Sequence, residues 1–159
     1  MKNLQITRAT IKDVNIIHNF MLIQAEDERK YLNNLDNKNK KDLFYTKSEI
    51  KKIISSKNNY LVISKLDKIL VGCGLAKIEK ASKWNKYNKQ GYLGMLYIDK
   101  KYRRKGIAIA LQNNRINWLH SKGIKYLTCT VLSHNTPIIN LLNKQGFNPH
   151  SIIMYKELK

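Results

Sequence analysis

The segment from residue 91 to residue 120 restricts the possible folds of this chain more than any other. An apolar run at residues 92–98 is typical of a buried strand, and a short charged turn follows it. Gly106 then opens a segment with helical spacing at residues 107–122. Because the strand leads through a glycine-containing turn into a helix, we expect an anion-binding helix N-terminus within an α/β fold.

The turn itself is basic, since Arg103, Arg104 and Lys105 are consecutive. The first backbone N–H groups of a helix have no partner inside the helix, and the helix dipole favours negative charge near them. Gly106 lets the backbone approach a ligand because it has no Cβ atom. Arginine side chains add forked hydrogen bonds to phosphate. These features favour a phosphate ligand, and the alternative is a solvated loop.

Hydrophobic spacing predicts the order β-α-α-β-β-β-α-β-α-β for the whole chain. This order favours one α/β domain over residues 1–159, with a mixed sheet that begins as an antiparallel meander and continues through helical crossovers. Gly72 and Gly74 indicate a bulge or a close approach inside a strand. The other expected strands lie at residues 4–9, 60–66, 69–78, 125–132 and 152–158, and the other helices at residues 14–25, 31–35, 46–56 and 136–145, with an exposed loop at 33–41.

The sequence contains no pattern for a metal ion, a disulfide or a membrane span. Its two cysteines lie in separate expected strands, and its four histidines are scattered. No segment approaches the roughly 18 consecutive apolar residues of a transmembrane helix. The N-terminal residues lack the apolar core of a signal peptide. We therefore expect a cytoplasmic protein without a bound metal.

The chain is strongly basic, with 30 Lys and Arg against 11 Asp and Glu and a formal net charge of +19. One interpretation is a polyanionic partner such as nucleic acid or anionic lipid. The other is compositional, because the lysines are spread over nearly every segment. We favour the compositional interpretation, since nucleic-acid surfaces usually combine clustered charge with interleaved aromatic residues and we identify no such cluster.

Two segments together resemble a known family. Residues 103–108, with the sequence RRKGIA, match the R/Q-x-x-G-x-G/A signature of the GNAT superfamily of acetyl-CoA-dependent N-acetyltransferases. Asn135, expected to cap a helix unless Thr136 does so, and the following Gly146-Phe147 resemble the second conserved segment of that family. The resemblance is strongest over residues 95–147, and the expected element order is also that of the GNAT fold.

The resemblance implies acetyl-CoA as co-substrate and a splayed pair of parallel strands, with helices on both faces of the sheet. The pyrophosphate would bind the backbone amides of residues 104–108, and the pantetheine arm would lie between residues 92–98 and 125–131. Arg103, Lys105 and either Lys101 or Lys144 would offset the phosphate charge. The cofactor-binding residues implied in this way are Leu96, Tyr97, Ile98, Arg103, Arg104, Lys105, Gly106, Ile107, Ala108 and Asn135.

The resemblance also implies direct attack of an acceptor amine on the thioester within a ternary complex. Leu142 stands where the family usually has a tyrosine that protonates the leaving thiolate, so either another group or water serves, or the thiolate leaves unassisted. Tyr155 and Ser133 are the candidates that we retain, beside Tyr97 and His134. Glu79 is the candidate general base, and its alternative is a solvent-facing charge. A backbone N–H near Leu96 or Ile98 would polarise the carbonyl.

An acidic run suggests the nature of the acceptor. Glu26, Asp27 and Glu28 are consecutive in a basic chain and favour a cationic amine; the alternative is a solvated helix end. We expect an N-acetyltransferase for a primary amine, carried by a small molecule or a protein, in a monomer or homodimer. The alternative is a nucleic-acid- or ribosome-associated protein with a regulatory, weakly catalytic or non-catalytic CoA site.

Overall fold

The computed structural model describes residues 3–29, 45–154 and 156. The chain divides into two compact units, Met1–Cys129 and Thr130–Lys159. The expected helix at residues 31–35 and loop at 33–41 lie outside the described residues, and the expectation of one domain over residues 1–159 stays a prediction.

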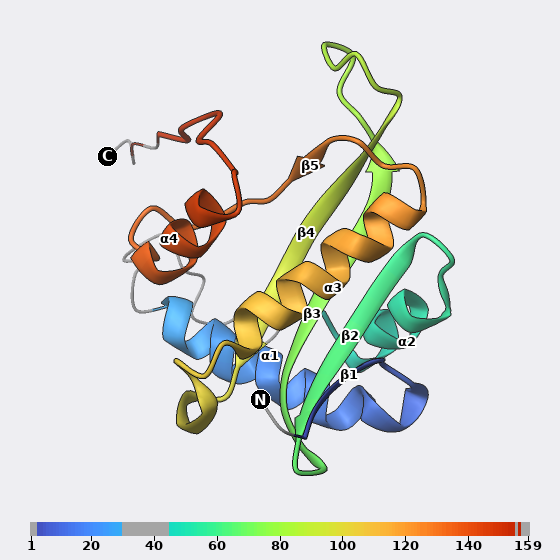
Figure 1. Cartoon of the computed structure of the whole chain (residues 1–159), viewed down its shortest axis with the longest axis vertical. Helices are drawn as coiled ribbons and strands as arrows, with labels where there is room; N and C mark the ends of the chain where they lie inside the picture. The colour runs from blue at the N-terminus through green and yellow to red at the C-terminus, as the bar shows by residue number, and fades with distance from the viewer. Residues whose placement is uncertain (1–2, 30–44, 155, 157–159) are drawn as a thin grey trace. The chain divides into compact units, whose positions relative to one another are not determined.

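The first unit contains a mixed, mostly antiparallel sheet, as predicted, and this sheet has five strands in the described residues instead of the six expected (Figure 1). Its strands are β1 (Leu4–Arg8), β2 (Asn59–Leu66), β3 (Ile69–Lys80), β4 (Lys89–Ile98) and β5 (Leu127–Thr128). The strands follow one another in sequence order across the sheet. Neighbours from β1 to β4 are antiparallel, whereas β4 and β5 are parallel.

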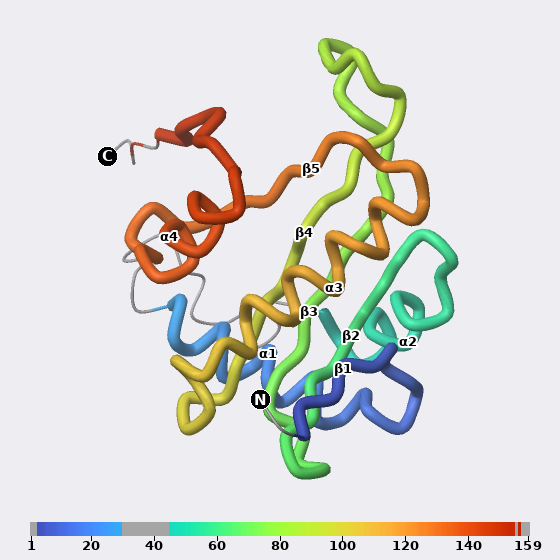
Figure 2. Tube along the Cα trace, viewed as in Figure 1, coloured from blue at the N-terminus to red at the C-terminus, as the bar shows by residue number. Residues whose placement is uncertain are grey.

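Helices cover both faces of this sheet, which confirms the expected layering (Figure 2). On one face, α1 (Val14–Arg29) and α2 (Lys47–Ser55) pack with Ile17 and Ile50 against inward residues of the sheet. On the other face, α3 (Ile107–Ser121) packs with Leu111. A short 3-10 turn, η1 (Ile11–Asp13), precedes α1. The second unit contains α4 (Thr136–Lys144).

Local sequence signals place several element boundaries correctly. The capping box forms at the start of α2, where the Thr46 N–H donates to Glu49 Oε2 at 2.7 Å. Asp67 and Lys68 form the tight turn between β2 and β3 with positive φ angles of 50° and 70°. Such a pair of positive angles matches the twist of a two-residue hairpin.

The glycines of β3 lie where other groups come close. A Cβ atom on Gly72 would lie 2.7 Å from the Tyr97 carbonyl oxygen. A Cβ atom on Gly74 would lie 3.1 Å from the guanidinium of Arg115. The expectation of a close approach is therefore correct, and the pairing with β4 also changes register directly after Gly74.

Two strand predictions are wrong. The strand expected at residues 125–132 is limited to Leu127–Thr128, because only these residues pair with β4. The strand expected at residues 152–158 does not form in its described part, residues 152–154 and 156. Ile152, Ile153 and Met154 are exposed there. Apolar β-forming residues make a strand only where a neighbouring strand accepts and donates the ladder hydrogen bonds.

Candidate functional site

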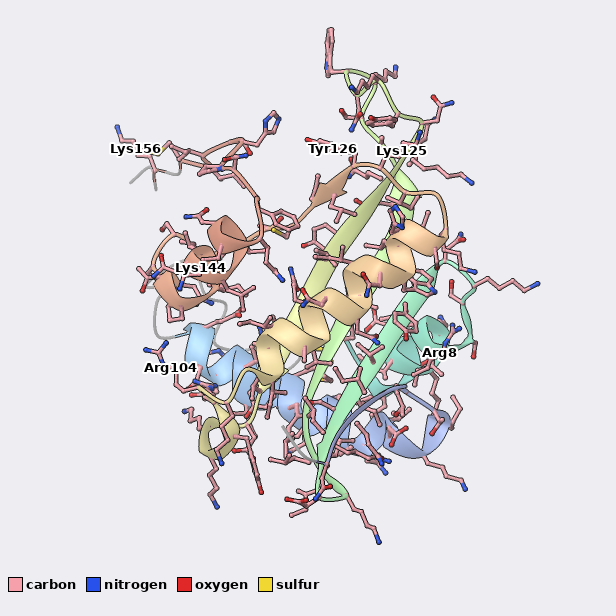
Figure 3. All side chains as sticks on the ribbon, viewed as in Figure 1. Arg8, Arg104, Lys125, Tyr126, Lys144 and Lys156 are labelled. Atoms are coloured by element: carbon pink, nitrogen blue, oxygen red, sulfur yellow. The ribbon has the colours of Figure 1, made fainter. Side chains whose placement is uncertain are left out.

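The turn between β4 and α3 presents a row of unpaired backbone donors. Arg104 and Gly106 adopt positive φ angles of 62° and 74°, and α3 begins at Ile107. Within the described ranges, no carbonyl or side chain accepts a hydrogen bond from the backbone N–H groups of residues 104–108. Arg104 is exposed beside this row (Figure 3). Unpaired N–H groups at a positive helix end are the donor set that a phosphate group requires, so the residues fit the pyrophosphate predicted for this turn.

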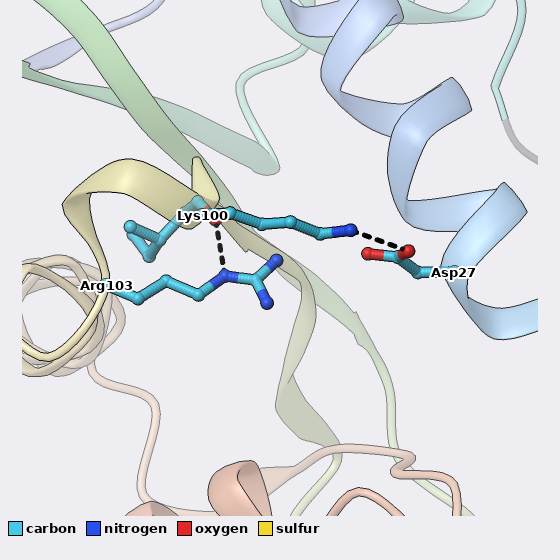
Figure 4. Close-up of polar contacts among 4 residues, drawn as sticks. Asp27, Lys100 and Arg103 are labelled. Carbon is cyan, nitrogen blue, oxygen red and sulfur yellow. Dashed lines mark hydrogen bonds and ion pairs between the residues drawn. The ribbon is translucent and has the colours of Figure 1, made fainter.

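Side-chain hydrogen bonds hold this turn against the end of β4. Asp99 Oδ1 accepts from the Lys101 N–H at 2.9 Å and caps η3 (Lys100–Tyr102). The Nε of Arg103 donates to the Ile98 carbonyl oxygen at 3.0 Å (Figure 4). No described residue accepts from the terminal nitrogens of Arg103, so they remain available to an anion.

The parallel strands β4 and β5 pair over a short stretch only. Their register includes only Gly91 with Leu127 and Tyr92 with Thr128. The Gly91 N–H also donates to the Tyr126 carbonyl oxygen at 2.9 Å. From residue 93 to Ile98, β4 has no β5 partner, and the splay that the resemblance implies stays a prediction. Alternate backbone groups along this edge need another partner.

A buried arginine supports β4 from the α3 side. Arg115 is 1% exposed, and its Nη1 donates to the carbonyl oxygens of Leu75, Gly94 and Met95 at 2.9, 3.0 and 3.0 Å. Its Nη2 donates to Gln112 Oε1. Burial lowers the pKa of Arg115 to about 10, so the guanidinium remains charged at neutral pH.

This arginine lies beneath a β-bulge. Gly74 pairs with Leu96 and Ala76 with Leu93, so β4 advances three residues while β3 advances two. A bulge disrupts the ladder and leaves backbone groups without their normal partners. Arg115 supplies hydrogen bonds to carbonyls in this region and so fixes the course of β4. We missed this residue in the sequence, although Gln112 and Arg115 are polar residues on the buried face of α3.

The predicted residues of β4 face different layers. Tyr97 packs its ring against Phe20 of α1, with centroids 4.8 Å apart, and is buried. Burial, and then the charge of Asp99, raises the pKa of the Tyr97 hydroxyl. Leu96 and Ile98 belong instead to the core beneath α3. Tyr97 is thus a core side chain, and only its backbone lies along the open edge of β4.

The acidic run lies at the end of α1, and one of its members reaches the basic turn. Asp27 Oδ1 accepts from Lys100 Nζ at 3.0 Å (Figure 4). Glu26 lies 3.6 Å from the Arg29 guanidinium, and Glu28 accepts from Gln24 at 2.8 Å. Of the three carboxylates, Asp27 is therefore the one that joins the α1 end to the turn after β4.

Of the candidate proton-transfer residues, Glu79 is the one whose position relative to the basic turn the structure describes, and it lies away from that turn. Glu79 is exposed and accepts from Gln90 Nε2 at 2.9 Å, at the end of β3 opposite the Gly72–Ile98 pair. Tyr155 lies outside the described residues. In the second unit, Ser133 is exposed in the turn before α4, and Leu142 is buried.

Asn135 has the expected position at the start of α4 but not the expected local contact. Its carbonyl oxygen accepts from the Ile138 and Ile139 N–H groups at 3.1 Å each, while its side chain makes no capping hydrogen bond. With ψ at 63°, its backbone departs from the extended conformation in which a side chain usually caps a helix.

The described residues also bear on metal binding and membrane insertion. They contain no group of three or more His, Cys, Asp or Glu side chains that could hold a metal ion. Among the helices described, none is both long and apolar enough to span a membrane.

Comparison with solved structures shows which fold this arrangement belongs to. A tetramutant of the BH1408 protein from Bacillus halodurans has a TM-score of 0.84 at 13% identity, with 97% of this chain and 99% of that chain covered. The aminoglycoside N-acetyltransferase AAC(6')-Iy in complex with CoA has a TM-score of 0.74 at 16% identity, with 98% and 95% covered. An aminoglycoside acetyltransferase from an uncultured soil metagenomic sample has a TM-score of 0.68 at 16% identity, with 98% and 97% covered. At these identities the likeness establishes the fold.

Sequence comparison establishes the family. No curated protein matches the chain. The sequence model of the Acetyltransferase (GNAT) family matches residues 22–147, a span that contains β4, the basic turn and α3. With this match over most of its length, the chain belongs to the GNAT family of acetyltransferases.

Proposed function

We propose that this protein transfers an acetyl group from acetyl-CoA to a primary amine. One observation carries the proposal: the unpaired N–H groups of residues 104–108 lie directly after the open edge of β4. A phosphate-binding turn next to an unpaired strand edge suits a ligand that has both a pyrophosphate and an extended amide-containing arm.

In this proposal the turn binds the charged end of the co-substrate. The backbone N–H groups of residues 104–108 hold the pyrophosphate, and the terminal nitrogens of Arg103 add charge-assisted hydrogen bonds. Exposed Lys105 offsets the remaining phosphate charge. Acetyl-CoA itself supplies an acetyl thioester that is activated for transfer.

The edge of β4 positions the reaction. Backbone groups of Leu96 and Ile98 bind the arm as a neighbouring strand would, and a backbone N–H of this edge polarises the carbonyl. The acceptor amine attacks the carbonyl carbon in its neutral form, the C–S bond breaks with its electron pair on sulfur so that CoA leaves as the thiolate, and the nitrogen loses a proton to water or to a base. Arg115 keeps the edge in place, because alignment of two bound substrates supplies much of the rate gain.

Two observations support a small cationic amine as acceptor. The structure of AAC(6')-Iy in complex with the bisubstrate analogue CoA-S-monomethyl-acetylneamine has a TM-score of 0.73 to this chain. In this chain, the Asp27 carboxylate lies next to the turn after β4, where it pairs with Lys100, and a cationic acceptor would have to share this carboxylate with Lys100. A protein amino group remains the second acceptor class to be tested.

The co-substrate site is tested by paired glycine substitutions. Gly106→Glu places a side chain and a negative charge in the row of N–H groups, and we expect acetyl-CoA affinity to fall at least about tenfold by calorimetry. Gly123→Glu is the matched control, because Gly123 has a similar φ of 75° at the other end of α3 and open space around its Cα. Equal losses in both variants would show that backbone strain, not the phosphate site, causes the effect.

The activity is tested by an acceptor screen that follows release of the CoA thiol. Aminoglycosides, polyamines and peptides with a free N-terminus or lysine represent the acceptor classes. Acetyl-CoA binding without CoA release for any class would contradict the enzymatic proposal and favour the regulatory CoA site considered as the alternative.

A further inference from the structure

The hairpin between β3 and β4 carries a basic surface that the proposed reaction does not use. Figure 1 shows this hairpin extending past the adjacent ends of β2 and α3. Trp84 at its tip is 97% exposed. We define the basic hairpin surface by Lys80, Lys83, Lys86, Lys89 and Trp84, with the half-buried Tyr87. The four lysines are exposed and recur every third residue, and an aromatic residue lies in each of the last two intervals between them.

The segment before β5 adds positive charge next to this surface. Gly91 pairs with Leu127, so the segment before β5 lies beside the base of the hairpin. Exposed Lys125 and half-buried Tyr126 are found there (Figure 3). From residue 80 to residue 156 the sequence has one carboxylate side chain, Asp99, which caps η3 at the far end of β4. Glu79, which accepts a hydrogen bond from Gln90 at the base of the hairpin, offsets one of these charges, and the basic hairpin surface keeps a net positive charge.

This surface is separate from the proposed CoA site. Lys89 begins β4 and Ile98 ends it, so the two ends of the strand are about 30 Å apart at ~3.3 Å per residue. Arg104 lies beyond the far end (Figure 3). The phosphates of a CoA molecule bound at the basic turn cannot account for lysines at the hairpin.

We propose that the basic hairpin surface binds single-stranded nucleic acid. An exposed indole ring can stack on an unpaired base of any sequence, and lysines on either side can contact the phosphates that flank it. Lys86 already lies 5.2 Å from the centre of the Tyr87 ring, which gives an alternating cationic and aromatic surface. An anionic membrane is less suitable, because Trp84 is the only exposed large hydrophobic residue described between residues 80 and 90.

Intrinsic fluorescence tests the stacking. The chain has two tryptophans, and Trp118 of α3 is stacked on Tyr60 of β2 with ring centroids 4.9 Å apart. We expect an oligouridylate of about 12 nucleotides to quench Trp84. In Trp84→Phe the remaining Trp118 emission should not change on addition of the oligonucleotide. Unchanged emission of the unsubstituted protein at saturating oligonucleotide would overturn the proposal.

Matched charge variants test the phosphate contacts. Lys83, Lys86 and Lys89 are replaced together by Gln, and Lys47, Lys51 and Lys57, exposed on and after α2, are replaced in the control. Anisotropy titrations at several salt concentrations should show about tenfold weaker binding for the hairpin variant. The slope of the logarithm of the binding constant against the logarithm of the salt concentration should become shallower by ~0.7 for each phosphate that is no longer neutralised. The control should keep its affinity within about twofold. Equal weakening in both variants would attribute binding to net charge and contradict the proposal.

The stacking and charge contributions are separable. Trp84→Ala should weaken binding by about tenfold while the salt dependence stays the same, because this variant removes stacking on a base and leaves the lysines that neutralise the phosphates. Ribose and deoxyribose oligomers of the same sequence distinguish RNA from DNA. Binding to vesicles that contain phosphatidylserine is measured for comparison. Tighter binding to these vesicles than to the oligonucleotide would overturn the proposal. All readouts are binding measurements, so the result does not depend on acetyltransferase activity.

Discussion

The buried Arg115 donates a hydrogen bond from Nη1 to the carbonyl oxygen of Gly94 at 3.0 Å, within the β-bulge of β4. The same nitrogen reaches across to the Leu75 carbonyl of β3 at 2.9 Å. One charged group of α3 thus joins the two strands at the point where their register changes. The course of β4 therefore depends on Arg115, which reaches the sheet from the face that α3 covers, opposite the face that α1 covers.

Replacement of Arg115 should weaken both the fold and the reaction. Arg115→Met leaves three carbonyl oxygens without this donor, and we expect the free energy of unfolding in urea to fall by about 3 kcal/mol. In the proposed reaction, kcat should fall more than the KM for acetyl-CoA changes, because the alignment of the β4 edge is disturbed. Arg115→Lys keeps a positive charge but lacks the several fixed N–H donors of the guanidinium, so we expect a stability and a kcat between those of the parent and the Met variant. Unchanged stability of the Met variant would refute this role.

The two glycines of β3 should differ in their tolerance of a methyl group. Gly72→Ala places Cβ 2.7 Å from a backbone oxygen, which cannot move without the sheet, whereas Gly74→Ala meets the Arg115 side chain at 3.1 Å. We expect losses of about 3 and about 1 kcal/mol in the free energy of unfolding. Thermal and urea denaturation measure both values. The reverse order would mean that Arg115 is held more rigidly than the β4 backbone.

The capping box of α2 predicts a pH dependence of stability. Hydrogen bonds from the Thr46 backbone N–H and then from its hydroxyl lower the pKa of Glu49. Because the folded state favours the ionised carboxylate, its contribution is present above the unfolded pKa of about 4.3 and is lost as the pH falls through the lower folded pKa. Glu49→Gln should therefore be less stable than the parent at pH 7 and equal to it at low pH. A stability difference that is independent of pH would contradict the cap.

Asp27 should affect the acceptor and not the co-substrate. If its carboxylate attracts a cationic amine, Asp27→Asn should raise the KM for that amine by about fivefold and leave acetyl-CoA affinity unchanged. Glu26→Gln is the matched control, since it removes the same charge one residue earlier, where the carboxylate faces Arg29. A similar KM increase in both variants would indicate a general charge effect.

Local features of this chain were predictable because they depend on few neighbouring residues. The capping box at residues 46–49, the Asp67-Lys68 turn and the progression from β4 through Gly106 into α3 all formed as expected. In each, the side chain or φ angle that decides the conformation belongs to the segment itself. The resemblance carried by residues 103–108 also led to the family that the sequence model supports.

Features that depend on distant partners were not predictable in the same way. Hydrophobic spacing suggested strands at residues 125–132 and 152–158, but among the described residues of these two ranges only Leu127–Thr128 pair with a neighbouring strand. The lysines and aromatics of residues 80–89 are readable in the sequence, yet we interpreted them as composition because only the structure shows them exposed on a projecting hairpin. The sequence by itself determined the basic turn and its helix; the tertiary structure decided how far β4 and β5 pair and that Arg115 supports the bulge. The reason is that pairing and burial depend on residues far apart in the chain, whereas capping and turns do not.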